Sequence, residues 1–148
     1  MRDADSEWTL AQKYYDLVIR DFGLPEIDLF ASHLNSKCHV FASWHPDPES
    51  TYVDAFTISW SNKYFFAFPP FCLLPRVLRK IRTDKARGIV VAPVWTSQPW
   101  YPLYMSMTSS TILNLGPCPD MIFCPLTNRA HPLSSSVRYM VAILSSDP

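Results

Sequence analysis

Apolar residues recur every three or four positions in two segments of the chain, which is the spacing of one face of an α-helix. The first segment covers residues 9–22 and opens with Thr9 and Gln12, a pair that matches a capping box. The second covers residues 73–87, where Pro75 is tolerated because it falls in the first turn. The pattern therefore predicts two amphipathic helices.

Short apolar runs rich in β-branched and aromatic residues lie between and after these helices, which is typical of strands. Residues 89–92 (IVVA) show no alternation, as expected of a strand buried on both faces of a parallel sheet. With residues 63–68 and the helix between them, this run predicts a βαβ unit. The full expectation is strands at 26–30, 52–56, 63–68, 89–92, 111–115 and 121–124, a proline-broken loop at 43–50 and a short helix at 99–105. The last two strands are expected to pair antiparallel and close the sheet.

The composition predicts one soluble globular domain. The chain has 148 residues, of which 48% are hydrophobic and 14% aromatic, which excludes a disordered chain and is enough for a sizeable core. The longest apolar run, residues 64–75, is too short and too rich in proline to cross a bilayer, and residues 1–7 contain no apolar leader. We expect an intracellular protein, nuclear or cytoplasmic, with no membrane partner. Its expected parts are a disordered segment at 1–7, one domain at 8–130 and a tail or linker at 131–148.

The net charge of the chain is +0, which excludes a domain-wide basic field for nonspecific nucleic-acid binding. Cations are nevertheless concentrated in the second predicted helix and just after it. Two interpretations stay open for this patch, the solvated face of a helix and a local contact with nucleic acid. Its members are Arg76, Arg79, Lys80, Arg82, Lys85 and Arg87.

Several common chemistries lack their motifs. The four cysteines are read as reduced thiols, and the cluster of His33, Cys38, His39 and His45 matches no zinc-binding spacing, so no metal is expected. With only 3 glycines, the chain has no phosphate-binding loop and no dinucleotide-binding fingerprint. Ser32 lacks the G-x-S-x-G context of a hydrolase nucleophile.

Two strand ends carry the candidate chemistry. Residues 65–71 (FFAFPPF) form an apolar strand that runs directly into two prolines and an aromatic residue, which fixes a rigid turn where α/β sheets usually bind ligands. Residues 26–30 are followed by the small residues Ala31 and Ser32, another common start of an α/β binding site. The residue just before the prolines, Phe68, is placed to decide the chemistry.

Over residues 8–101 the chain resembles the phage-type DNA N6-adenine methyltransferases. The resemblance rests on four motifs that occur in this order: EIDLFAS, VDAF, FAFPPF and GIVVAPVW. The resemblance implies an α/β fold with three layers and a mostly parallel sheet of the S-adenosylmethionine-dependent methyltransferase type, here reduced. It implies S-adenosylmethionine as the cofactor. By position, it assigns Asp28, Ala31, Ser32 and Asp54 to cofactor binding, and Phe68, Pro69, Pro70 and Phe71 to the catalytic motif that holds the flipped adenine.

The chain also resembles a segment of DIRS-type retrotransposon polyproteins that lies between the reverse transcriptase and RNase H domains and the tyrosine recombinase. The shared pattern includes DLFAS, VDAF, FPPF and VLRKI, and the final RAHPL is similar to the stretch that leads toward the recombinase. This resemblance implies DNA or RNA and the neighbouring reverse transcriptase and RNase H as partners. The active-site residues of the two neighbouring enzymes are not found here, so their activities are not transferred.

Phe68 stands where the methyltransferase motif has Asn or Asp. The lone pair of the adenine amino nitrogen is delocalised into the ring, so methyl transfer needs acceptors that draw on the amino hydrogens, and a phenyl ring accepts none. Losing one such polar group typically costs about 3 kcal/mol, or about two orders of magnitude in rate. The sequence therefore predicts a catalytically degenerate, methyltransferase-like module with a packing or nucleic-acid-contact role. The alternatives are an active DNA N6-adenine methyltransferase, in which Asp54 is the nearest substitute acceptor, and a nonfunctional fragment.

Purely structural interpretations also stay open for most of these residues. Asp28 is then a cap of the turn after its strand, Asn35 a turn residue, and Phe71 part of the core, where its ring could otherwise stack on a base. Three aromatic residues of the following segment are interpreted as packing rather than as a platform for nucleic acid, namely Trp95, Trp100 and Tyr101.

Overall fold

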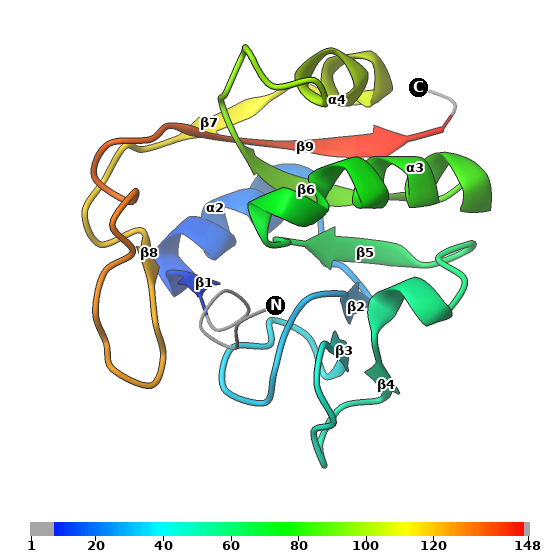
Figure 1. The fold of residues 1–148 in the computed structure, drawn as a ribbon, viewed down its shortest axis with the longest axis horizontal. Coiled ribbons are helices and arrows are strands. Elements are labelled where there is room, and N and C mark those ends of the chain that lie inside the picture. The colour runs from blue at the N-terminus through cyan, green and yellow to red at the C-terminus, as the bar shows by residue number, and fades with distance from the viewer. Residues whose placement is uncertain (1–7, 147–148) are drawn as a thin grey trace.

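A computed structural model describes residues 8–146 as an α/β fold around a seven-stranded sheet (Figure 1). Across the sheet the strands are ordered β4-β3-β2-β5-β6-β9-β7. The strands are β2 (Ile27–Asp28), β3 (Val40–Ser43), β4 (Tyr52–Val53), β5 (Tyr64–Ala67), β6 (Arg87–Pro93), β7 (Leu113–Leu115) and β9 (Tyr139–Ser145). The expected α/β class with a mostly parallel sheet is confirmed.

One strand of this sheet runs against the other six. The pairs from β4 through β6 are all parallel, whereas β9 is antiparallel to both β6 and β7. β9 also makes the longest ladder, with seven paired positions along β6. The segment 131–148, which the sequence indicated as a tail or linker, thus supplies an interior strand whose seven residues are all buried.

Helices cover both faces of the sheet, which gives three layers. α2 (Gln12–Phe22) packs against one face through Tyr15 and Val18, in a cluster that includes Phe66 of β5. α3 (Leu74–Asp84) and α4 (Tyr101–Met107) pack against the other face, in a cluster that includes Phe65. Within residues 8–146, no helix is long and apolar enough to cross a membrane. The connections from β2 to β3 and from β3 to β4 contain no α-helix in this part of the chain, and the connection from β4 to β5 has only the short 3-10 helix η1 (Ala55–Thr57).

A separate two-stranded sheet joins the N-terminal segment to the connection between β7 and β9. β1 (Thr9–Leu10) pairs antiparallel with β8 (Ile122–Phe123), on the side of the molecule toward which β5 points (Figure 1). Of the two segments expected to be antiparallel strands that close the sheet, 111–115 does so as the edge strand β7, whereas 121–124 forms β8 in the separate sheet. The long buried run of β9 offers β7 more apolar contact area than a hairpin with the two-residue β8.

The start of the first helix also differs from the prediction. Thr9 lies in β1, where its Oγ is placed to donate to the carbonyl of Leu10 (3.4 Å), so it does not cap the helix. α2 begins at Gln12 after Ala11, which provides no side-chain cap. The predicted capping box is wrong because pairing with β8 takes this segment out of the helix. The prediction for residues 1–7 lies outside the described residues.

Gly88 lets β5 and β6 approach closely beside the FFAFPPF segment. It is paired with Phe65, and a Cβ added at Gly88 would lie 2.4 Å from Cγ of that buried ring. We expect Gly88→Ala to lower the free energy of unfolding by about 1 to 3 kcal/mol, because the core must shift to admit the methyl group. Urea denaturation measures this loss. In a Phe65→Leu background Gly88→Ala should cost less, and additive effects of the two changes would contradict the proposed clash.

Candidate ligand-binding site

A cavity of about 410 Å³ opens at the carboxyl ends of β2, β3 and β5. The chain passes outward from β2 to β3 and β4 and then returns to β5 on the other side of β2, so this is the point where the strand order reverses. Open α/β sheets usually bind ligands at such a point, and the volume is in the range of small-molecule pockets. The walls come from residues 30–34, 43–47 and 68–73, together with Trp8 and His131.

Six of the eight residues that the sequence assigned to the site line this cavity. Ala31 and Ser32 do so from the end of β2, and four consecutive residues, 68–71, do so from the end of β5. Asp28 and Asp54 are not among the lining residues. The local motifs therefore meet as predicted, without the two carboxylates.

Asp28 is buried beneath the loop that follows β2, with 2% of its surface exposed. Its carboxylate accepts hydrogen bonds from the backbone N–H of Lys37 (2.9 Å) and of Phe30 (3.4 Å). Burial raises the pKa of Asp28 to about 6, although these two hydrogen bonds and the charge of Lys37 act in the opposite direction. Asp28 thus holds the loop that forms one wall of the cavity, in agreement with its interpretation as a cap.

Asp54 is a cap at the end of β4. Its backbone adopts φ 63°, and its carboxylate accepts the backbone N–H of Phe56 (3.0 Å) at the start of η1. The aspartate of VDAF therefore ends strand β4 and starts the next turn. This position does not bring Asp54 into the cavity wall as a substitute acceptor.

Phe68 is half-buried in the cavity wall and leaves the cavity open. Its ring meets the buried ring of Tyr139 edge to face, with centroids 6.3 Å apart and an interplanar angle of 84°. The Tyr139 hydroxyl is buried without a hydrogen-bond partner, and burial raises the pKa of Tyr139 to about 12. Phe68 therefore forms an aromatic part of the wall and does not block the cavity.

Phe71 packs against neighbouring aromatic rings and also lines the cavity. Its ring packs edge to face on Trp95 with centroids 5.0 Å apart, and lies 6.1 Å from the ring of Tyr139. It also lines the cavity as the first residue of η2 (Phe71–Leu73). Because its neighbours fix the ring, Phe71 forms a rigid wall for a flat ligand.

The N-terminal segment and the connection from β8 to β9 supply walls that the sequence did not predict. The rings of Trp8 and His131 meet edge to face, with centroids 4.5 Å apart, and both line the cavity. They are more than a hundred positions apart and are brought together by the pairing of β1 with β8. No local pattern signals this contact.

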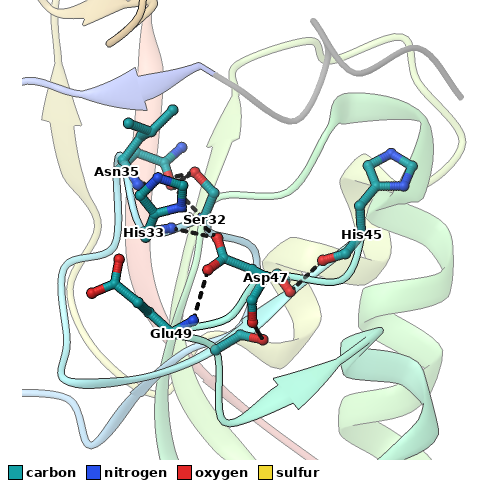
Figure 2. A network of polar contacts seen from close by, with 9 residues as sticks. Ser32, His33, Asn35, His45, Asp47 and Glu49 are labelled. Atoms are coloured by element: carbon teal, nitrogen blue, oxygen red, sulfur yellow. Dashed lines mark hydrogen bonds and ion pairs between the residues drawn. The ribbon is translucent and has the colours of Figure 1, made fainter.

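Asp47 ties together the two loops on the β2–β3 side of the cavity (Figure 2). One carboxylate oxygen accepts the backbone N–H of His33 (2.9 Å) and contacts Nδ1 of the same residue (2.8 Å), and the other accepts the backbone N–H of Glu49 (2.9 Å). The backbone N–H of His33 is the main reason that the pKa of Asp47 lies below its usual value. Only 7% of the Asp47 side chain is exposed, so this carboxylate is a structural clamp in the cavity wall.

Asn35 completes the turn beside the clamp. Its side-chain oxygen accepts the backbone N–H of Ser32 (2.7 Å), and its amide donates to the carbonyl of Trp8 (3.3 Å). The second contact connects the β2–β3 loop to the N-terminal segment. Asn35 therefore acts as a turn residue, in agreement with its structural interpretation. Figure 2 shows it on the same side of the network as His33.

Side chains that could hold a metal ion gather at the rim. Ligand atoms of His33, Asp47 and Glu49 lie within 4.8 Å of one another. Because Asp47 already accepts three contacts, this group serves to close the loops. The thiol of Cys38, from the histidine-rich cluster in the sequence, lies instead 3.7 Å from the carbonyl of Pro25, and all four cysteines of the chain are free thiols.

The cavity is chemically suited to a flat, uncharged ring. Among residues 8–146, Asp47 is the only carboxylate in its lining, no lysine or arginine is present there, and the basic side chains are three histidines, His33, His45 and His131. Five phenylalanine and tryptophan side chains line it, namely Trp8, Phe30, Trp44, Phe68 and Phe71. Such walls favour stacking and edge contacts with aromatic rings, whereas a phosphate group would find no lysine or arginine among these residues.

Comparison with protein-family profiles matches no family, and comparison with curated proteins finds no match.

Proposed function

We propose that this chain is a catalytically degenerate, methyltransferase-like module of a retrotransposon polyprotein, which binds a flat aromatic ligand and transfers no methyl group. The observation that carries the proposal is Phe68. It lines an open cavity directly before Pro69 and Pro70, where methyl transfer to an amino nitrogen requires a hydrogen-bond acceptor.

The strand order supports the methyltransferase part of the proposal. Numbered along the chain, the sheet runs 3-2-1-4-5-7-6, and only the seventh strand is antiparallel. The dinucleotide-binding fold instead has the order 3-2-1-4-5-6. A final antiparallel strand inserted beside the fifth is typical of the S-adenosylmethionine-dependent methyltransferases that the sequence resembles.

The lining residues fit S-adenosylmethionine only in part. Its adenine ring matches the aromatic walls, but its ribose hydroxyls and amino-acid group need polar partners. Asp47 already accepts three contacts, and Asp28 is closed off beneath its loop. This arrangement supports binding of the adenine ring and only weak affinity for the whole cofactor.

The site lacks the hydrogen-bond acceptor that prepares the amino nitrogen of adenine for methyl transfer. Phe68 offers no oxygen to the amino hydrogens, and neither Asp54 nor Asp28 lies in the lining to replace it. The remaining cavity keeps the rigid turn of Pro69 and Pro70 and the wall of Phe71. The role that we propose for the module is then contact with DNA or RNA bases, or packing against the neighbouring domains of a polyprotein.

Titration calorimetry with S-adenosylmethionine and with adenosine tests the proposed binding. We expect adenosine to bind, and Trp44→Ala to weaken this binding about 5- to 150-fold, because loss of one stacking wall costs about 1 to 3 kcal/mol. Tyr101→Ala is the matched control, since Tyr101 is half-buried and does not line the cavity. No heat from either ligand at millimolar concentration would contradict a binding role for the cavity.

Methyl transfer to an adenine-containing DNA duplex tests the proposed loss of catalysis. The unchanged chain should show no transfer above background, and Phe68→Asn tests whether restoring an acceptor restores activity. Transfer by the unchanged chain would replace the proposal with an active DNA N6-adenine methyltransferase. If Phe68→Asn gains activity, loss of the acceptor is the reason for the inactivity.

A further inference from the structure

The net charge of zero conceals a strong asymmetry along the chain. Residues 74–87 hold six of the 13 cations and one of the 13 carboxylates, a net charge of 6 − 1 = +5. The rest of the chain then has 7 − 12 = −5. A separation of this size produces a positive local field on a neutral protein.

The cations of this segment lie on the solvent side of α3 and just beyond it. The opposite side of the helix is fully buried, through Leu74, Val77, Leu78 and Ile81. Lys80 pairs with Asp84 (3.0 Å), which also accepts the backbone N–H of Trp60 (2.9 Å), so the single carboxylate of the segment is already engaged. Four exposed cations lie on α3 and at its C-cap, Arg76, Arg79, Arg82 and Lys85, and we call them the α3 cation stripe. Arg87 is also exposed, but it pairs with Tyr64 in the sheet and lies on the face that α2 covers.

The α3 cation stripe has regular spacing and no acidic neighbours in contact. Arg76, Arg79 and Arg82 are three residues apart, about 4.5 Å along the helix axis for each step. Lys85 continues the series as the C-cap of α3. Among residues 8–146, no ion pair joins any member of the stripe to a carboxylate.

An aromatic ring holds the first member of the stripe in place. The guanidinium of Arg76 lies 4.0 Å from the ring centroid of Phe56. This cation–π contact restricts the side chain without neutralising its charge. The end at Arg76 is close to the cavity, because Cys72 and Leu73 line the cavity just before α3 begins.

The chemistry of the stripe favours a polyanion over a protein or a membrane. The core of a protein interface needs apolar and aromatic side chains, and the exposed large hydrophobic residues of the described chain all lie outside α3. Membrane binding by a helix needs an apolar face that can insert, and that face of α3 is buried in the core. Arginine predominates in the stripe, and its planar fork matches phosphate oxygens.

We infer that the α3 cation stripe is a docking surface for the phosphate backbone of nucleic acid, independent of base sequence. This inference does not depend on the function proposed for the cavity. Four cations in one stripe match an affinity dominated by release of counterions from the nucleic acid, which is strongly dependent on salt.

Fluorescence anisotropy with a labelled 25-base-pair duplex and a single strand of the same length, from 50 to 300 mM salt, tests the inference. The test variant is Arg79→Gln, Arg82→Gln and Lys85→Gln together, which leaves Arg76, the member held by an aromatic ring. The control variant is Arg20→Gln, Arg129→Gln and Arg138→Gln, all exposed and outside α3, which removes the same charge. Thermal denaturation of both variants verifies that they fold.

For the duplex, we expect the test variant to reduce the slope of log K against log salt by about 2.7, because each phosphate contact contributes about 0.9. Affinity at 50 mM salt should fall at least tenfold, with a much smaller change in the control. Equal losses in both variants would overturn the inference, since they would show only an effect of net charge. Salt-sensitive self-association that the test variant abolishes, measured by sedimentation, would also overturn it, because the stripe would then bind another copy of the chain.

Discussion

Replacing Trp60 with alanine is expected to lower the free energy of unfolding by about 3 to 5 kcal/mol, the range for removal of a large aromatic side chain from a core. Trp60 has no exposed surface and lies at the centre of an aromatic cluster, with ring centroids 5.3 Å from Phe65, 5.8 Å from Phe56 and 6.5 Å from Phe30. Its indole N–H donates to the carbonyl of Ala55 (2.9 Å), which would lose this partner. Cavity formation and the lost hydrogen bond act in the same direction.

Urea denaturation, monitored by circular dichroism, measures this effect. Trp60→Phe separates its causes, since it keeps most of the ring and removes the donor, and should cost less than the alanine variant. Trp95→Ala is the control for loss of a tryptophan that is only half-buried. A loss below about 1 kcal/mol for Trp60→Ala would show that the cluster is not tightly packed around Trp60. Because Phe30 also lines the cavity, Trp60→Ala should weaken adenosine binding as well.

The second large effect is a pH dependence that originates at Asp28. Burial raises the pKa of Asp28 to about 6 in the folded protein, whereas an aspartate side chain ordinarily has a pKa of 3.8. Between these values the folded state holds a proton that the unfolded state has released. The contribution of Asp28 to stability is thus fully present below about pH 4 and is lost as the pH rises through 6, by roughly 3 kcal/mol in total.

Asp28→Asn isolates this contribution, because an amide of the same shape does not titrate. The free energy of unfolding of the variant minus that of the unchanged protein should rise by roughly 3 kcal/mol between pH 4 and pH 7. Urea titrations at half-unit pH intervals provide the curve. A constant difference over this range would mean that Asp28 ionises as easily in the folded protein as in the unfolded chain.

Asp120 provides a control of opposite sign. The thiol of Cys118 and the ammonium of Lys13 donate hydrogen bonds to its carboxylate and lower its pKa to about 2. Its contribution is therefore present above about pH 4 and is lost as the pH falls toward 2. For Asp120→Asn, the same difference should fall with rising pH in the acid range and stay level from pH 4 to 7.

Segments stabilised by local pattern were predictable. The strand at 63–68, the helix at 73–87 and the strand at 89–92 correspond to β5, α3 and β6, because an apolar stripe and a buried β-branched run identify a βαβ unit by themselves. β3 was missed, since Val40–Ser43 is short and ends in a polar residue. β9 was missed because a seven-residue apolar run has no period that separates a buried strand from a helix.

The residues of the site were likewise predictable only where the local sequence determines their position. Ala31, Ser32 and the residues of FPPF could be predicted as wall residues because they follow strands that end at one edge of a parallel sheet. Asp47 could not, since its role depends on hydrogen bonds to His33, fourteen positions away in another loop. For two acidic residues the local prediction was wrong in the opposite sense. Asp28 is the last residue of β2 and Asp54 follows β4, as site carboxylates do, but both hold turns outside the cavity lining.

The sequence by itself determined the α/β class, the central βαβ unit and the absence of an acceptor at Phe68, because each follows from residue type and short-range spacing. Only the tertiary structure decided that Phe68 leaves a cavity open and that Trp8 and His131 enclose it. It also showed that the members of the α3 cation stripe lie together, with no ion pair to a carboxylate among residues 8–146. These features depend on contacts between residues distant in the chain, whose loop-closure entropy is offset only by the complete core, so no local pattern specifies them.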